Sequence, residues 1–232
     1  MKFGSNDIAQ MVDLSAVRAN DGDESIEKLV KVAKKYNTYL VTTLPSETPL
    51  AIKLLGEKSS IGVSGNIGFP SGGHTTHIKV AETKELLKMG CTELDMVISI
   101  GKLISGKYQD VLDDIRAVVE AAEGTLLKVI LECHYLNEEQ ILKGCDLSIQ
   151  AGANFVKTGT GWAPTGATLE NIGLIKKHVG NAMQIKASGG IRNLETIVEM
   201  YKRGARRFGI GLRWAPSIFE TCNSLPNGCI EF

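Results

Sequence analysis

The sequence predicts an α/β fold in which eight parallel strands and their helices close into one (β/α)8 TIM barrel. Short apolar segments of strand length recur eight times, and helix-like stretches lie between them. Strands that alternate with helices are typical of parallel sheets, and eight such units suit a closed barrel. No linker, low-complexity tract or charge block interrupts the series. We therefore expect a single domain over residues 1–232.

Each strand candidate is short and largely apolar. In chain order the candidates are Met11–Leu14, Tyr39–Thr42, Ile61–Val63, Leu94–Ile98, Leu126–Leu131, Phe155–Lys157, Gln184–Lys186 and Arg207–Ile210. Residues Ser25–Ala33 illustrate the helices between them, because their apolar positions return every three or four residues. Three strands follow a glycine and a small residue, at Gly90, Gly152 and Gly204, and each glycine is predicted to end a helix.

Charged residues stand inside several strand candidates. Alternate residues of a strand share a face, which groups Lys128 with Ile130 and Glu132, Glu93 with Asp95 and Val97, and Phe155 with Lys157 and Gly159. Both faces of a strand are covered in a parallel barrel, so these charges must be buried with partners or point into a site at the carboxyl ends. The sequence therefore predicts a polar pocket at that end.

The composition excludes several classes of partner. Of the 232 residues, 43% are hydrophobic and 22% charged, and the formal net charge is zero. We therefore expect a substantial core and neither a nucleic-acid nor a membrane partner. The amino-terminal residues lack the apolar run of a signal peptide, which favours a cytoplasmic protein. Five scattered cysteines are expected to be reduced and structural.

Two lysines, Lys157 and Lys186, each end an apolar run and precede a glycine-rich turn. Burial disfavours the charged form of an amine, so we expect a lowered pKa, and a second cation nearby would lower it further. The pair is interpreted as one activated and one tuning amine. The small residues that follow Lys157, up to Gly161, let backbone and hydroxyl groups approach a ligand, which favours a Schiff-base role over a structural ion pair.

Three further charged residues could serve these amines. Asp95 is predicted to be buried, either as a structural acid or as a group that moves protons through water. Asp13 stands in the first strand candidate, where structure and function are equally plausible. Lys128 is expected to pair with Asp95 or Glu132 and to position rather than react.

Glycine turns after the last two strands suit an anion. Gly189 and Gly190 precede a helix expected to start near Asn193, and Gly209 and Gly211 form a second turn. Clustered backbone N–H groups and a helix dipole favour phosphate, and barrels often bind it beside their seventh and eighth strands. A plain tight turn is the alternative.

A metal centre is not expected. His74 and His77 share one loop and His134 follows another strand, but zinc needs three convergent ligands and no acidic partner stands beside them. We interpret these histidines as loop and helix-start residues, and expect no cofactor.

Taken together, the motifs resemble the deoxyribose-phosphate aldolase family over nearly the whole chain. They are Val12–Leu14, Gly68–Pro70 with Thr75, Thr76 and Lys79, Glu93–Ile98, Leu127–Glu132, Val156–Thr158 and Lys186–Arg192. The resemblance implies a metal-independent class I aldolase that takes part in deoxyribonucleotide catabolism. Such an enzyme cleaves 2-deoxyribose 5-phosphate reversibly to glyceraldehyde 3-phosphate and acetaldehyde. Its partners would be small aldehydes and sugar phosphates, and a homodimer or higher homo-oligomer is compatible with it.

The resemblance also implies residue roles. Lys157 would form the Schiff base, Lys186 would depress its pKa, and Asp95 would take part in proton relay. Asp13, Lys128 and Thr160 would support the site.

Several residues depart from the family pattern. Serines are common where this chain has Gly159, Gly211 and Leu212, and Trp162 replaces a smaller or polar residue. Arg213 could replace the lost hydroxyl contacts to phosphate. Some members end in a tyrosine that aids proton transfer, whereas Phe232 has no hydroxyl.

Two alternatives therefore stay open. The chain could act on a non-phosphorylated or differently charged substrate, or it could be a barrel that binds a sugar phosphate without catalysis.

Overall fold

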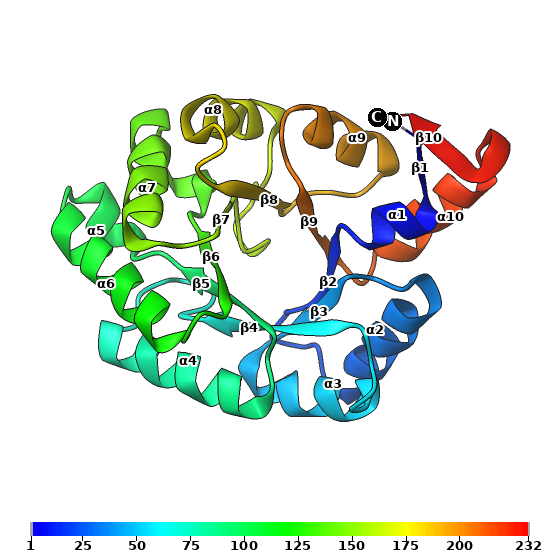
Figure 1. Ribbon diagram of the computed structural model, residues 1–232, viewed down its shortest axis with the longest axis horizontal. Coiled ribbons are helices and arrows are strands. Elements are labelled where there is room, and N and C mark those ends of the chain that lie inside the picture. Colours follow the sequence, from blue (N-terminus) through cyan, green and yellow to red (C-terminus); the bar gives the residue numbers. More distant parts are fainter. Residues whose placement is uncertain (1, 232) are drawn as a thin grey trace.

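The computed structural model describes residues 2–231 and confirms the predicted barrel (Figure 1). Its parallel strands close in chain order, so that the last pairs with the first. They are β2 (Val12–Ala16), β3 (Leu40–Thr43), β4 (Gly62–Ile67), β5 (Glu93–Val97), β6 (Leu126–Ile130), β7 (Phe155–Lys157), β8 (Gln184–Ser188) and β9 (Arg207–Gly211). Each overlaps its candidate; β4 and β8 run further toward the carboxyl end than expected.

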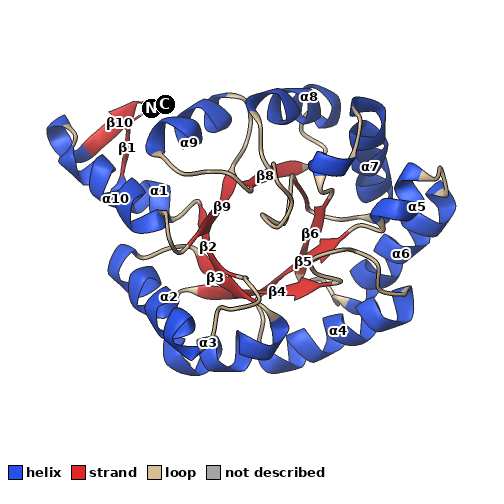
Figure 2. Cartoon of the chain, turned by 180° about the vertical axis from the view of Figure 1, so that it is seen from behind, coloured by secondary structure: helices blue, strands red, loops and turns tan. Residues whose placement is uncertain are grey.

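Helices surround the strands on the outside, as Figure 2 shows. The helices that follow successive strands are α2 (Asp23–Tyr36), α3 (Thr48–Leu55), α4 (Thr76–Met89), α6 (Tyr108–Ala121), α7 (Glu138–Ala151), α8 (Leu169–Val179), α9 (Leu194–Lys202) and α10 (Ala215–Ser224). Short elements add α5 (Ile100–Ile104) and the 3₁₀ turns Pro45–Glu47, Cys133–Tyr135 and Pro226–Gly228. The barrel is therefore an inner ring of strands inside an outer ring of helices.

The apolar core lies between these two rings. In α2, Ile26, Leu29, Val30 and Ala33 are buried, at the spacing that places them on one helix face. They belong to the same cluster as outward-facing strand residues such as Leu14. Most apolar side chains of the strands face outward, so the interior of the barrel holds their alternate residues, charged ones among them.

Left-handed glycines end two of the helices, as the repeat predicts. Gly90 caps α4 with φ +105° and Gly152 caps α7 with φ +87°, conformations that side chains disfavour. In the third repeat α9 ends at Arg203, and Gly204 follows with φ +112°. The chain thus turns back into the next strand at the same point of each unit.

A two-stranded antiparallel sheet joins the two ends of the chain, a feature the sequence analysis does not predict. Strand β1 (Lys2–Gly4) pairs with β10 (Cys229–Glu231), and α1 (Ser5–Ala9) leads into the barrel. Figure 1 shows this sheet beside α10, outside the barrel wall. Phe232, whose side chain bears on the question of a final proton donor, lies outside the described residues.

Among residues 2–231, none of the helices combines the length and the apolar character that crossing a lipid bilayer requires.

Candidate active site

Seven charged side chains meet inside the barrel. They are Asp13 on β2, Glu93 and Asp95 on β5, Lys128 on β6, Lys157 on β7, Lys186 on β8 and Arg207 on β9. Strand register brings them together, because Asp95 lies opposite Lys128, Lys157 opposite Lys186, and Lys186 opposite Arg207. All seven are buried. The structure therefore unites the predicted lysines and acids, and adds Glu93 and Arg207.

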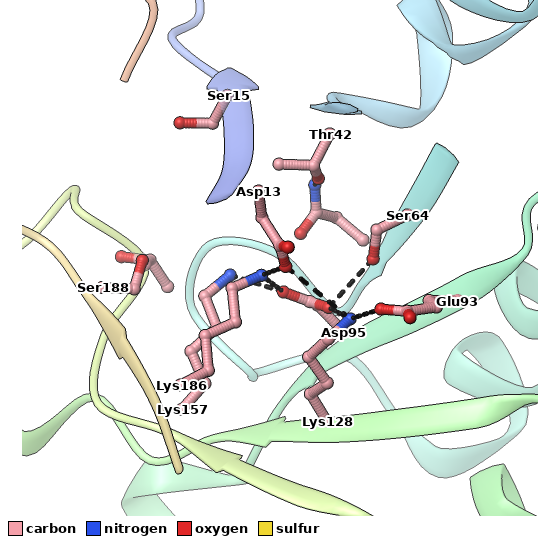
Figure 3. A network of polar contacts seen from close by, with 12 residues as sticks. Asp13, Ser15, Thr42, Ser64, Glu93, Asp95, Lys128, Lys157, Lys186 and Ser188 are labelled. Carbon is pink, nitrogen blue, oxygen red and sulfur yellow. Dashed lines mark hydrogen bonds and ion pairs between the residues drawn. The ribbon is translucent and has the colours of Figure 1, made fainter. Parts of the chain in front are cut away.

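Asp95 stands at the centre of this cluster (Figure 3). Its Oδ1 accepts hydrogen bonds from Lys128 Nζ at 2.7 Å and Ser64 Oγ at 2.9 Å. Its Oδ2 accepts from Lys157 Nζ and Lys186 Nζ, each at 2.7 Å. Burial alone would raise the pKa of Asp95, but the three lysines outweigh burial and hold it well below its ordinary value. Asp95 is therefore a carboxylate that links the two amines.

Lys128 and Lys186 each contact a second carboxylate. Lys128 Nζ lies 2.7 Å from Glu93 Oε2, and Lys186 Nζ lies 2.5 Å from Asp13 Oδ2. Burial lowers the pKa of Lys186 to about 8, although Asp13 and Asp95 oppose this effect. For Lys128 burial is outweighed by Asp95, Asp13 and Glu93, which raise its pKa. Lys128 is thus a stable cation, whereas Lys186 can release its proton near neutral pH.

Lys157 is the least restrained of the three lysines. The one carboxylate within ion-pair distance of its Nζ in the described residues is Asp95, whose Oδ2 it shares with Lys186. Lys157 is 4% exposed, whereas Lys128 and Lys186 are completely buried. Lys157 and Lys186 both border a small hollow that Ser188 also lines. Lys157 is the more exposed of the two, so it is the amine that a ligand in the barrel mouth reaches more easily.

The turn after β7 is held by Glu132. Both oxygens of Glu132 accept from the backbone N–H of Thr160, and Oε2 also accepts from the Thr160 hydroxyl. Of the two partners predicted for Lys128, Asp95 is therefore correct, and Glu132 binds Thr160 instead. Burial raises the pKa of Glu132, and the bonds from Thr160 oppose this. A Cβ at Gly159 would lie 2.7 Å from Glu132 Oε1, so a serine there would displace the Glu132 carboxylate.

Polar side chains that the sequence analysis missed line the inner wall. Asn66 donates to Thr42 Oγ1 at 2.9 Å and to the carbonyl oxygen of Thr43. Thr158 donates to the Ser188 carbonyl and accepts from the Ser188 N–H, both at 2.9 Å. These residues alternate with apolar ones on their strands or follow a strand directly. The face alternation used for the lysines would have found Thr42, whereas Asn66 lies beyond the strand candidate that ends at Val63.

A cavity of about 610 Å³ opens above the lysines, at the carboxyl ends of the strands. All the residues predicted to bind phosphate line it, namely Gly161, Gly189, Gly190, Gly209, Gly211 and Arg213. Thr160 lines it too, and Ser15, Thr160, Ser188 and Gly209 also border the hollow at Lys157. The predicted anion site therefore adjoins the predicted nucleophile.

The glycines allow two turns to cross at this cavity. The N–H of Ala167 donates to the carbonyls of Ser188 and Gly189, and a Cβ on Gly166 would lie 2.5 Å from Gly189 backbone atoms. Helix α9 begins only at Leu194, where the Asn193 side chain accepts from Thr196 N–H. The start near Asn193 is confirmed, but the cavity is lined by the turn rather than by the first turn of the helix.

Arginines surround the mouth of this cavity. Arg18 donates from Nη2 to the Gly161 carbonyl at 2.6 Å and lies over the Trp162 ring. Arg192 and Arg213 lie over Trp214, at 5.3 and 5.0 Å from the ring centroid. The sequence analysis named Arg213 but missed the other two. Asp21, whose side chain accepts from the Arg18 N–H, is the acid among the lining residues, so the mouth favours anions.

Trp162, one of the departures from the family pattern, spans the mouth. Its Nε1 donates to the Val17 carbonyl at 2.8 Å, and its ring packs edge-on against Phe69. It therefore ties the β7–α8 loop to the β2–α2 loop. Leu212 also lines the cavity, and its N–H donates to the Ser15 carbonyl.

The histidines lie apart from the lysine cluster. His74 Nδ1 contacts Glu82, an acidic partner that the sequence analysis did not identify, and His134 Nδ1 contacts Thr165 Oγ1. His77 belongs to the first turn of α4. Within residues 2–231, no three His, Cys, Asp or Glu side chains converge as a metal site would need.

Another hollow, of about 690 Å³, lies beside Lys34, Asn37 and residues 55–61. It is at the amino ends of β3 and β4, and none of the predicted site residues borders it. In parallel barrels the chemistry is placed at the carboxyl ends of the strands. The cavity beside the lysines is therefore the candidate active site.

Known proteins that are similar to this chain in sequence include aldolases. Residues 8–213 match the family described as DeoC/LacD family aldolase. The chain is 45% identical over 204 residues to the deoxyribose-phosphate aldolase of Klebsiella pneumoniae, covering 87% of this chain and 82% of that protein. It is 42% identical over 225 residues to that of Sinorhizobium medicae, covering 97% and 91%.

A solved structure gives the same result for the fold. The tetrameric deoxyribose phosphate aldolase from Aeropyrum pernix superposes with a TM-score of 0.86 at 28% identity, covering 96% of this chain and 93% of that one. Both the family match and the relatives extend over most of the chain, including the strands that carry the lysines. The chain belongs to the DeoC/LacD family of aldolases.

Proposed function

We propose that this protein is a class I deoxyribose-phosphate aldolase, which cleaves 2-deoxyribose 5-phosphate to glyceraldehyde 3-phosphate and acetaldehyde. The single observation that carries the proposal is the shared carboxylate oxygen of Asp95, which accepts hydrogen bonds from both Lys157 and Lys186. A free amine beside a second cation and a buried acid is the arrangement that Schiff-base chemistry needs. The names of the relatives support the substrate.

In this proposal Lys157 is the nucleophile. Its Nζ attacks the aldehyde carbon of the open-chain sugar, and loss of water gives an iminium ion on Lys157. The C2–C3 bond then breaks as the C3 hydroxyl loses its proton, so that C3 leaves as the aldehyde and the electron pair forms an enamine. Protonation of the enamine at its terminal carbon and hydrolysis release acetaldehyde and restore the amine.

Asp95 and Lys186 move the protons in these steps. Asp95 Oδ2 lies within hydrogen-bond distance of both amines, so it can pass a proton between Lys157 and Lys186. Lys186, with a pKa of about 8, is protonated for the most part at neutral pH. Lys186 thus places a second cation beside Lys157, at the Asp95 oxygen that the two amines share. Asp13 and Lys128 hold this pair in place from below.

The phosphate group is proposed to bind in the mouth of the cavity. Backbone groups of Gly189, Gly190 and Gly211 face it, and the guanidinium groups of Arg192 and Arg213 supply positive charge. The arginines therefore compensate for the serine hydroxyls that this chain lacks. This charge favours a phosphorylated substrate over a neutral one.

Reductive trapping tests the chemistry. Incubation with acetaldehyde and cyanoborohydride should attach a two-carbon group to Lys157, located by peptide mass spectrometry, and Lys157→Ala should abolish it. Labelling elsewhere with none at Lys157 would refute the mechanism. Retro-aldol rates with phosphorylated and free 2-deoxyribose, compared as kcat/KM, test the substrate, and equal values would refute the proposed phosphate contact.

The wider setting belongs to the same proposal. Residues 1–232 would act as one domain, and a phosphorylated substrate, which does not cross membranes unaided, supports action in the cytoplasm. The tetrameric relative supports assembly into a homo-oligomer, which light scattering would test.

A further inference from the structure

Arg207 and Glu93 lie at the amino ends of β9 and β5, beneath the lysines, and the steps proposed above give neither a task. Arg207 Nη2 lies 3.2 Å from Glu93 Oε2, and Nε donates to Asp13 Oδ1 at 2.9 Å. The ring of Tyr39 covers the guanidinium at 3.8 Å from its centroid. Arg207 is 7% exposed and Glu93 5%. The barrel therefore encloses a fixed cation and an acid beside its reactive amines.

Arg207 stays charged throughout. Burial would lower its pKa, but Asp13 and Glu93 outweigh burial and raise it. A guanidinium is therefore unable to relieve any excess of positive charge by losing a proton. A lysine can do so, because its pKa falls readily when burial or a neighbouring cation disfavours the ammonium form.

The cluster holds more cations than acids. Arg207 and the three lysines stand against Asp13, Glu93 and Asp95, so one positive charge is left without a carboxylate. The wall formed by β3 and β4 contributes neutral groups such as Thr42, Ser64 and Asn66. Glu132, the next acid toward the mouth, binds Thr160, and the Lys157 charge also acts on its carboxylate. Lys157 and Lys186 share one oxygen of Asp95, so a change in the surrounding charge bears on this pair.

Arg207 and Glu93 act on this excess in opposite directions. Arg207 binds Asp13 and Glu93, the second carboxylates of Lys186 and Lys128, so it withdraws negative charge from both lysines. Glu93 neutralises part of Arg207 and of Lys128. Removal of the arginine charge should favour the ammonium forms, and removal of the glutamate charge should disfavour them.

We propose that Arg207 and Glu93 are positioning residues that set the pH at which the Lys157–Lys186 pair releases a proton, Arg207 lowering that pH and Glu93 raising it. The inference rests on the proposed function, in which Lys157 must be a free amine to react. Neither residue touches the substrate. Arg207 acts through the carboxylates that hold the lysines, and Glu93 acts through Arg207 and Lys128.

The test measures the trapping of acetaldehyde on Lys157 by cyanoborohydride as a function of pH, with peptide mass spectrometry as the readout. We expect the midpoint to rise by about one pH unit in Arg207→Met and to fall by about one unit in Glu93→Gln, for charges several ångströms away in a partly shielded interior. Arg207→Lys keeps the charge and should keep the midpoint. The double variant Glu93→Gln/Arg207→Met removes both charges and should restore it.

Matched controls separate the possible failures. Glu220→Gln removes a carboxylate from an exposed ion pair with Lys35 and should leave the midpoint in place. Adducts on Lys157 with the same midpoint in every variant would overturn the inference while leaving the proposed function intact. Absence of the adduct in the unaltered protein at every pH would overturn the proposed function. If Arg207→Met does not fold, two results still decide the inference. The midpoint should fall in Glu93→Gln, and it should return to the wild-type value in the double variant.

Discussion

The two halves of the active site are built in different ways. Beneath the cavity, the lysine cluster rests on strands, and each charge contacts a charge on a neighbouring or facing strand. Above it, the anion-binding mouth rests on loops, and its arginines lie over tryptophan rings. The cluster is buried, whereas Arg18, Arg192 and Arg213 are substantially exposed. The strands of the barrel therefore determine the reaction, and the loops determine which substrate binds.

This difference predicts how each half tolerates change. Charges in the cluster depend on one another, because removing one leaves its partners buried without compensation. Charges in the mouth are solvated, so each contributes less and can be replaced by a neighbour. Substitutions in the cluster should therefore have large effects on both chemistry and stability, and those in the mouth small effects on affinity alone.

The largest effect is expected for Lys157→Ala, which removes the proposed nucleophile. The retro-aldol kcat should fall by roughly 10⁴-fold or more, the range typical for loss of a covalent catalyst. Lys177→Ala, which removes an exposed lysine of α8, is the matched control and should leave kcat unchanged. A residual activity within about ten-fold of the original would mean that another amine forms the Schiff base.

Asp95→Asn should weaken the cluster as a whole. It leaves three buried lysines with one fewer carboxylate, and the free energy of unfolding should fall by about 3–5 kcal/mol in urea titrations at pH 7. Asp113→Asn changes an exposed acid on α6 and should cost less than about 0.5 kcal/mol.

The loss of stability caused by Asp95→Asn, measured against wild type, should depend on pH. The folded pKa of Asp95 lies below its ordinary value of 3.8, so its stabilisation is present above that pH and is lost as the pH falls toward the folded pKa. The difference between wild type and Asp95→Asn should therefore shrink in acid. A difference that stays constant below pH 4 would contradict the lowered pKa of Asp95 in the folded protein.

Arg213→Gln should act on substrate affinity alone. Loss of one charge-assisted contact at a solvated site should raise KM for the phosphorylated sugar by about ten-fold. Acetaldehyde carries no phosphate, so its trapping on Lys157 should not change. Arg203→Gln, on the outer face of α9 where it pairs with Glu199, is the control. An equal loss with free 2-deoxyribose would show that Arg213 acts on the fold rather than on phosphate.

The sequence predicts the lower half of the site better than the upper half. Strand alternation places Asp95 and Lys157 inside the barrel because a strand has a fixed period, and the helix-ending glycines set the depth of each strand. It does not single out Arg207, which stands at the start of β9, whereas Lys157 and Lys186 end their strand candidates. Loop side chains such as Arg18 have no period, so their position depends on tertiary contacts such as its bond to Gly161.

The smallest predicted effect concerns Gly209 and Gly211, two glycines of strand β9. Both Gly209 and Gly211 line the cavity, where a serine at either position would add a hydroxyl. A Cβ on Gly211 meets no atom within 4 Å, whereas a Cβ on Gly209 would lie 2.5 Å from Ser188 Oγ and 3.5 Å from Lys186 Cε. Gly211 therefore belongs to the tolerant mouth, and Gly209 to the packed cluster.

Gly211→Ser should accordingly lower KM for 2-deoxyribose 5-phosphate by about two- to five-fold, the gain of one hydrogen bond, with kcat unchanged. Gly209→Ser should instead lower kcat and destabilise the fold by about 1–3 kcal/mol, because its side chain would displace Ser188 and press on Lys186. Steady-state kinetics and urea unfolding of the two variants place the boundary between the two halves of the site. Equal behaviour of both serines would mean that the phosphate site and the lysine cluster are not separable at this strand.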